Sequence, residues 1–346
     1  MPVAGEGVKI RGLIEGFYGT PWSHAERLDL IAFCGRHGLN TWVHAPKDDP
    51  YHRKLWREPY PDAELERIRE LVRQAEQHEV EFAYAIAPGL DVCYSKDSEL
   101  ETLVAKCGQV QGAGVRSVQL LWDDIEHALN CAEDEQRYGH AERPSGAAQS
   151  DFSNRFREAF EQPGPLVVCP IGYAGTGDSE YRRSFAPSLH PEIVVYWTGP
   201  EVVSWGINRE ALDATVDRFH GHELLLWDNY PVNDFDPERL FLGPLRGRDP
   251  RLAGGRLRGL IANGMVQAVP SKLALATAAD WARDPDAYDV LMSYERALQA
   301  HGREVLEALG PARANVTPPS DLPGLVDALL LGVDAATGAA LLEPFV

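Results

Sequence analysis

The chain has 346 residues, enough for one large α/β domain or two ordinary ones, and its 44% apolar and 25% charged residues are typical of a globular protein. The formal net charge of −19 argues against DNA or RNA as a partner but is compatible with a neutral substrate. The N-terminal segment MPVAGEGVKIRG lacks the apolar core of a signal peptide, and no stretch approaches the roughly 18 apolar residues of a membrane span. We therefore expect a cytoplasmic protein with no membrane partner.

Five cysteines are odd in number and show no C-x-x-C spacing, which favours reduced and mostly buried thiols. They are Cys34, Cys93, Cys107, Cys131 and Cys169.

One pattern repeats along the chain: a short apolar run ends in polar or Gly residues, and a segment with helical spacing follows. The predicted strands occupy residues 9–19, 40–47, 81–89, 117–124, 166–173, 192–199, 223–229 and 258–263. The predicted helices occupy residues 23–38, 62–79 and 97–114 and lie near 150–161, 179–189, 208–220 and 272–283. Ser23 and Glu26 form a capping box, and Gly35 and Gly38 suit the end of the first helix.

The strand runs are nearly continuously apolar, which is typical of a parallel sheet that is buried on both faces. Eight such units predict a (β/α)8 barrel over residues 1–285, with a doubly wound open sheet as the alternative. After residue 285 the pattern changes to helical runs at 286–310 and 321–342, separated by a Pro-rich segment. Residues 286–346 are therefore predicted to form a small helical appendage.

Polar and aromatic residues follow the ends of all eight predicted strands. They are Glu15 with Gly16, Lys47, Asp91, Asp123 with Asp124, Tyr173, Trp197, Asp228 with Asn229, and Asn263. In a barrel these strand ends meet at one face, where the active site is built.

The stretch LLWDDIE places Asp123 beside Asp124. Either one of them caps a following helix, or the two form an acid/base pair of the kind that cleaves glycosidic bonds. Two ionised carboxylates this close repel each other, which favours one of them staying protonated. Neighbouring strand residues point to opposite faces, so both can serve one site only if the backbone turns there.

Other motifs are weaker. The segment APKDDP offers Lys47 as a ligand contact or as an exposed loop residue, and WDNYPVND combines the polar and aromatic groups of a sugar pocket. The chain has no H-E-x-x-H motif, the segment 220–222 lies where a helix ends, and IGYAGTG lacks the order of a nucleotide loop, so no metal or nucleotide is expected. Trp42, Tyr84 and Tyr196 are interpreted as packing residues.

Taken in order, the segments EGFYGTPWS, APKDDPYHR, AIAPGLD, LLWDDIE, YAGT, WTGP, WDNYPVNDF with RLFLGP, and LIAN resemble glycoside hydrolase family 84. This is the family of protein O-GlcNAcases and bacterial β-N-acetylglucosaminidases, some described as hyaluronidases. The resemblance covers residues 9–283 and implies a (β/α)8 barrel that acts by substrate-assisted retention.

The resemblance implies that the acetamido oxygen of the substrate attacks its own anomeric carbon. Asp123 would accept the acetamido N–H, and Asp124 would be the general acid and then the base. The implied sugar-binding residues are Gly16, Lys47, Tyr173, Trp227, Asn229, Asp234 and Asn263. Ile171 and Gly172 depart from the family pattern, in which Thr and Glu are common.

These features predict an exo-β-N-acetylglucosaminidase that removes terminal O-linked GlcNAc without a cofactor or metal. Two alternatives stay open: the same activity on glycosaminoglycan or cell-wall glycans, and a barrel that binds GlcNAc conjugates without turnover. The oligomeric state and the physiological substrate are not encoded in these motifs.

Overall fold

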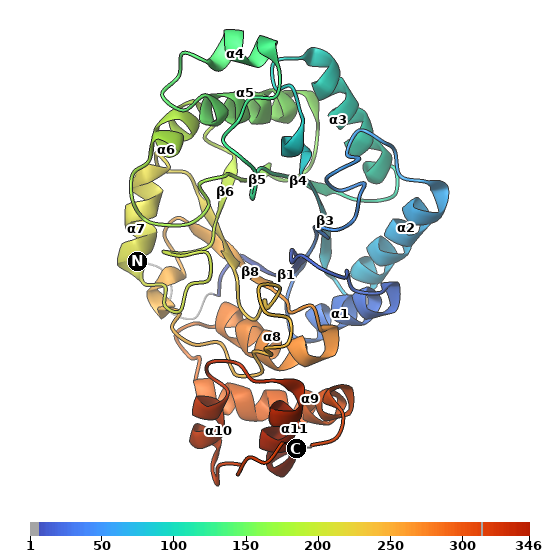
Figure 1. Ribbon diagram of the computed structural model, residues 1–346, viewed down its shortest axis with the longest axis vertical. Helices are drawn as coiled ribbons and strands as arrows, with labels where there is room; N and C mark the ends of the chain where they lie inside the picture. Colours follow the sequence, from blue (N-terminus) through green and yellow to red (C-terminus); the bar gives the residue numbers. More distant parts are fainter. Residues whose placement is uncertain (1–6, 313) are drawn as a thin grey trace.

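The computed structural model describes residues 7–312 and 314–346, and its central feature is a closed barrel of eight parallel strands. Each strand pairs with the next in the chain, and β8 pairs with β1 to close the sheet (Figure 1). The strands are β1 Ile10–Glu15, β2 Thr41–His44, β3 Glu81–Ile86, β4 Ser117–Leu121, β5 Val167–Cys169, β6 Val194–Trp197, β7 Leu224–Asp228 and β8 Leu257–Asn263. The predicted (β/α)8 barrel is confirmed, and the open sheet is excluded.

Helices surround the barrel in the order that the sequence predicts. They are α1 His24–Arg36, α2 Asp62–Gln77, α3 Asp97–Gln111, α4 Ala132–Tyr138, α5 Pro144–Ala159, α6 Glu180–Phe185, α7 Arg209–Arg218 and α8 Ala268–Arg283. Short 3-10 helices lie at η1 Pro88–Leu90, η2 Ala186–Ser188, η3 Pro250–Leu252 and η4 Glu343–Phe345. The short helix α4 was not predicted, and α5 and α8 begin earlier than expected. Pro144 and Pro270 lie in the first turns of those two helices, where a residue without an N–H is tolerated.

The capping box of α1 is confirmed, because the Glu26 N–H donates to Ser23 Oγ at 3.3 Å and the Ser23 N–H donates to Glu26 Oε2 at 2.7 Å. Gly38 follows the helix with a φ of +73°, as expected of a C-terminal glycine. Gly35 instead lies inside the helix, where an added Cβ would come within 2.5 Å of the His78 carbonyl oxygen. Its role is close packing of α1 rather than termination.

The strands lie between two apolar cores, one inside the barrel and one between the barrel and the helices. Alternate strand residues such as Ile14, Ala85 and Leu225 fill the barrel, while the others pack against the helices. Tyr196 belongs to the inner core, and Trp42 and Tyr84 belong to the outer core. All three are fully buried, so their interpretation as packing residues is confirmed.

The C-terminal helices α9 Val290–Leu309, α10 Leu322–Ala328 and α11 Ala335–Leu342 lie together beyond α8, on one side of the barrel (Figure 1). His301 of α9 reaches His37 after α1, with 2.8 Å between the two Nε2 atoms. Lys272 of α8 pairs with Glu304 of α9 at 2.6 Å. The division at residue 285 stays a prediction, and the first six residues of the predicted barrel domain lie outside the described residues. In the described part of the chain, every helix is too short or too polar to cross a membrane.

Candidate active site

The backbone turns at the end of β4, directly after the strand. Asp124 adopts a φ of +54°, in the left-handed region that Asp tolerates better than most residues. This turn breaks the alternation of the strand, so Asp123 and Asp124 line the same cavity. Asp123 is buried and Asp124 is exposed at the cavity surface. The turn of the backbone that a shared site requires is therefore present.

A cavity of about 290 Å³ opens at the C-terminal ends of the strands. Eight of the nine predicted site residues line it, and they are Gly16, Asp123, Asp124, Tyr173, Trp227, Asn229, Asp234 and Asn263. The ninth, Lys47, is not on the cavity wall, and its ammonium group contacts Asp123. Residues from five different strand ends thus meet at one place, as the (β/α)8 architecture predicts.

Asp123 is held by an ion pair with the Lys47 ammonium group, which donates to Oδ2. The other oxygen, Oδ1, is buried and has no hydrogen-bond partner among the described residues. Burial alone would lower the pKa of Lys47, but the charge and hydrogen bond of Asp123, together with the nearby Tyr18 and Asp124, outweigh it and the pKa is raised. Asp123 is therefore paired with a fixed cation and retains one free acceptor for a ligand N–H.

Asp124 accepts hydrogen bonds from two phenol groups. Tyr173 Oη donates to Oδ1 at 2.8 Å, and Tyr18 Oη donates to Oδ2 at 3.0 Å. Arg53 donates to Tyr18 Oη and, at 2.8 Å, to the main-chain oxygen of Asp124. Burial raises the pKa of both tyrosines, so that they stay protonated donors. This arrangement fixes the orientation of the Asp124 carboxyl group.

Tyr18 and Arg53 were not singled out from the sequence. Both lie inside segments that carry the family resemblance, EGFYGTPWS and APKDDPYHR, and that position was the available signal. Their contact with Asp124 joins residues that are 106 and 71 positions apart, which no local pattern encodes.

The remaining wall is built by Gly16, Trp227 and two asparagines. The Gly16 N–H donates to Asn263 Oδ1 at 3.2 Å, and Asn263 Nδ2 donates to Asn229 Oδ1 at 3.0 Å. A Cβ at position 16 would lie 2.4 Å from Trp227 Cζ2, so only Gly fits against the indole ring. Trp227 Nε1 is buried and, within the described residues, unpaired. Asp234 Oδ2 accepts the Tyr18 N–H at 2.8 Å.

Four strand-end residues do not line the cavity, although sequence reasoning grouped them with the others. Glu15 pairs with Arg27, Asp91 with Arg57, and Asp228 with Arg248. Trp197 Nε1 donates to the Gly175 carbonyl at 3.0 Å. These four side chains therefore make their contacts outside the cavity.

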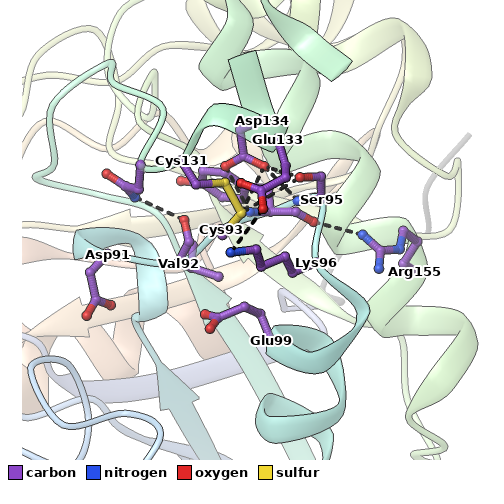
Figure 2. The surroundings of a disulfide bond; sticks show 12 residues. Asp91, Val92, Cys93, Ser95, Lys96, Glu99, Cys131, Glu133, Asp134 and Arg155 are labelled. Atoms are coloured by element: carbon purple, nitrogen blue, oxygen red, sulfur yellow. Dashed lines mark hydrogen bonds and ion pairs between the residues drawn. A yellow bond between two sulfur atoms is a disulfide. The ribbon is translucent and has the colours of Figure 1, made fainter. Parts of the chain in front are cut away.

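The expectation of reduced thiols is wrong for two cysteines. Cys93 and Cys131 form a disulfide with a Cα–Cα distance of 5.7 Å, within the usual range. Figure 2 shows the bond between the segment after β3 and the segment before α4, beside Lys96 and Glu133. The spacing of 38 residues gave no sequence signal, because the barrel alone brings the two segments together.

The other three cysteines, Cys34, Cys107 and Cys169, are free and buried, as expected, and burial raises the pKa of each thiol. In the part of the chain that the structure describes, a cluster of three ligand-type side chains occurs at Cys93, Cys131 and Glu133. The disulfide occupies both sulfur atoms there.

A protein-family model described as beta-N-acetylglucosaminidase matches residues 11–311, which includes all strands but the first residue of β1, and extends through α9. The chain belongs to the β-N-acetylglucosaminidase family. The family consists of glycoside hydrolases, and the resemblance to glycoside hydrolase family 84 is confirmed.

Three relatives support this membership. The Protein O-GlcNAcase of Rattus norvegicus is 38% identical over 276 residues, which are 78% of this chain and 29% of that protein. The structure of an O-GlcNAc hydrolase variant from Thermobaculum terrenum has a TM-score of 0.79 and 36% sequence identity to this chain. The match covers 87% of this chain and 65% of the Thermobaculum chain. A structure named CpGH84B has a TM-score of 0.78 and 33% identity, with coverages of 92% and 56%. The chain thus spans less than a third of the length of the curated relative.

Proposed function

We infer that the chain is a retaining exo-β-N-acetylglucosaminidase that hydrolyses terminal O-linked β-GlcNAc by substrate-assisted catalysis. The acetamido oxygen attacks the anomeric carbon while the bond to the leaving oxygen breaks, and an oxazoline forms. Asp124 donates a proton to the leaving oxygen. It then takes a proton from the water molecule that opens the oxazoline. The nucleophile is tethered to the reacting sugar, which makes the attack effectively unimolecular.

The observation that carries this proposal is the different environment of the two carboxyl groups. Asp123 has a cation on Oδ2 and a free acceptor at Oδ1, which suits an acetamido N–H that gains positive charge as the oxazoline forms. Asp124 lies at the open side of the cavity, where a leaving group exits and water enters. One carboxyl group therefore stabilises charge while the other exchanges a proton.

The wall residues suit the binding of one sugar ring. Trp227 offers an apolar face and an indole N–H that has no partner among the described residues, and Tyr173 offers a phenol beside Asp124. Asn229, Asn263 and Asp234 provide amide and carboxylate groups for hydroxyl contacts. Lys47, which the resemblance implies as a hydroxyl contact, instead acts on the site through its ion pair with Asp123.

The decisive experiment compares two aryl β-N-acetylglucosaminides, one with a poor leaving group and one with a good leaving group. Asp124→Asn should lower kcat/KM, which reports departure of the leaving group, by about 10²-fold to 10⁴-fold for the poor leaving group and much less for the good one, which leaves without a proton. Asp123→Asn should be impaired with both substrates, because oxazoline formation itself is affected.

The matched control is Asp91→Asn, the same chemical change at a strand end outside the cavity, which should keep wild-type activity. A competitive effect of a thiazoline analogue of the oxazoline would support substrate assistance. Full activity of Asp124→Asn on the poor substrate, or insensitivity to the thiazoline, would contradict the proposal.

The names of the rat and Thermobaculum relatives favour O-linked GlcNAc as the substrate class. Release of GlcNAc from a GlcNAc-peptide should therefore exceed release from a polysaccharide. A cytoplasmic location remains part of the proposal and is testable by cell fractionation. The Cys93–Cys131 bond is the feature that argues against it, because disulfides are rare in the cytosol.

A further inference from the structure

Arg182 of α6 is a buried cation that neutralises no carboxylate. Arg182 is 3% exposed. Its guanidinium forms no ion pair with any residue that the structure describes, and it donates to main-chain oxygens instead. It stacks on Phe219, with 4.8 Å from the guanidinium carbon to the ring centroid. Burial lowers the pKa of Arg182 to about 10. The neighbouring Arg218 also lowers this pKa, and Asp178 partly offsets the fall, so the guanidinium stays charged at neutral pH.

The donors of Arg182 go to main-chain carbonyls of a single loop. Nη1 donates to the Gly177 oxygen at 2.7 Å. Nη2 lies 3.0, 2.8 and 3.0 Å from the oxygens of Gly172, Ala174 and Gly175. Four carbonyl dipoles that point at one place repel each other unless a cation with several donors lies between them. The loop conformation therefore depends on the guanidinium.

This loop, residues 170–179, connects β5 to α6 and carries Tyr173. Two of the four carbonyls, those of Gly172 and Ala174, flank Tyr173 directly. The loop is also held by the residue after β6, because the Thr198 N–H donates to the Tyr173 oxygen at 3.0 Å. The backbone around Tyr173 thus has two independent anchors, and its phenol reaches Asp124 at 2.8 Å.

The same contacts explain why the Gly-rich segment IGYAGTG is not an anion loop. A phosphate site needs several main-chain N–H groups that converge on the ligand. Here the carbonyl oxygens converge instead, and a side chain of the protein occupies their focus.

We propose that Arg182 is a positioning residue, which acts on catalysis by holding the 170–179 loop so that Tyr173 meets Asp124 and the substrate. This inference rests on the proposed glycosidase function. Arg182 touches neither the cavity nor the reacting atoms, so its effect must pass through the loop.

The test uses Arg182→Lys, which keeps a positive charge but cannot reach four carbonyls with a planar set of donors. We expect kcat for an aryl β-N-acetylglucosaminide to fall by between about 10-fold and 100-fold, the scale of a misplacement of about 1 Å at a reacting centre. The matched control is Arg183→Lys at the adjacent position, which is exposed and pairs with Glu142 and Asp178. It should stay within about twofold of wild type, because exposed pairs contribute little.

A double-mutant cycle with Tyr173→Phe separates positioning from a general loss of structure. If Arg182 acts through the Tyr173 phenol, Arg182→Lys should cost less than about twofold in kcat once the phenol is absent. Losses that multiply in the double variant, or wild-type kcat in Arg182→Lys, would overturn the inference.

Each variant is assayed well below its own melting temperature, and Arg182→Gln serves as a second variant if Arg182→Lys does not fold. Arg182→Gln keeps side-chain N–H donors but removes the charge, so the same coupling to Tyr173→Phe is expected. An inactive wild-type protein would reject the proposed function. An active wild-type protein in which the Arg182 and Tyr173 substitutions lower kcat independently would reject only the role of Arg182.

Discussion

Replacement of Lys47 by Met removes the cation that accompanies Asp123. Met is similar in length and apolar, so the packing of the aliphatic stem is retained while the charge disappears. The two side chains are 1% and 5% exposed, so water cannot take over the role of the ammonium group. The variant therefore leaves a carboxylate buried without a partner.

Loss of one member of a buried ion pair costs about 3–5 kcal/mol in the free energy of unfolding. The contact of Lys47 Nζ with the Trp227 ring, 5.4 Å from its centroid, adds about 2 kcal/mol, the magnitude for a desolvated cation–π contact. Because the pKa of Lys47 is raised, this stability is fully present at neutral pH and is lost only as the pH rises through the alkaline range. We therefore expect Lys47→Met to be destabilised by at least about 3 kcal/mol at pH 7.

Urea unfolding of four proteins measures this value: wild type, each single variant, and Lys47→Met with Asp123→Asn. The double variant contains no unpaired charge and should be about 2 kcal/mol more stable than Lys47→Met. It should nevertheless remain inactive, because the Asp123 carboxylate is gone. A Lys47→Met protein destabilised by no more than about 1 kcal/mol, the typical effect of any single mutation, would refute the reasoning. A double variant that is less stable than Lys47→Met would also refute it.

Two further predictions concern the scaffold. Alkylation of the denatured, unreduced protein should modify three of its five cysteines, and a mass for five modified cysteines would reject the Cys93–Cys131 bond. Burial and the neighbouring His301 lower the pKa of His37 to about 4, so the unfolded chain binds more protons than the folded one between about pH 4 and 6.5. Stability should therefore fall as the pH drops through that range, and between pH 7.5 and pH 5 it should fall by about 1 kcal/mol more in wild type than in His37→Gln. Equal pH dependence in the two proteins would contradict this.

Helix boundaries illustrate where sequence reasoning reached its limit within the fold. The β-then-α repeat gave all eight strands, because apolar runs bounded by polar residues are a local signal. The helices α5 and α8 begin earlier than predicted, and their first turns contain Pro144 and Pro270, which lack the N–H that a helix interior requires but a first turn does not. The seven-residue helix α4 is too short to show a clear periodicity.

The family motifs identified residues that line the cavity. The strand pattern alone did not show which polar side chains at the strand ends point into the cavity and which point away from it. Glu15, Asp91 and Asp228 share the chemistry of Asp123 and Asp124, yet each is paired with an arginine outside the cavity. The direction of a side chain at a strand end depends on the turn that follows. A shared site at Asp123 and Asp124 required the backbone to turn there, and only the structure shows the turn, with Asp124 in the left-handed region.

The sequence by itself determined the barrel, its order of elements and the family, because these depend on local periodicity and on motifs of consecutive residues. Tertiary structure decided which groups meet: Lys47 with Asp123, Tyr18 with Asp124, Arg182 with the Tyr173 loop, and Cys93 with Cys131. Such contacts join residues far apart in the chain, and their distances exist only once the barrel has closed.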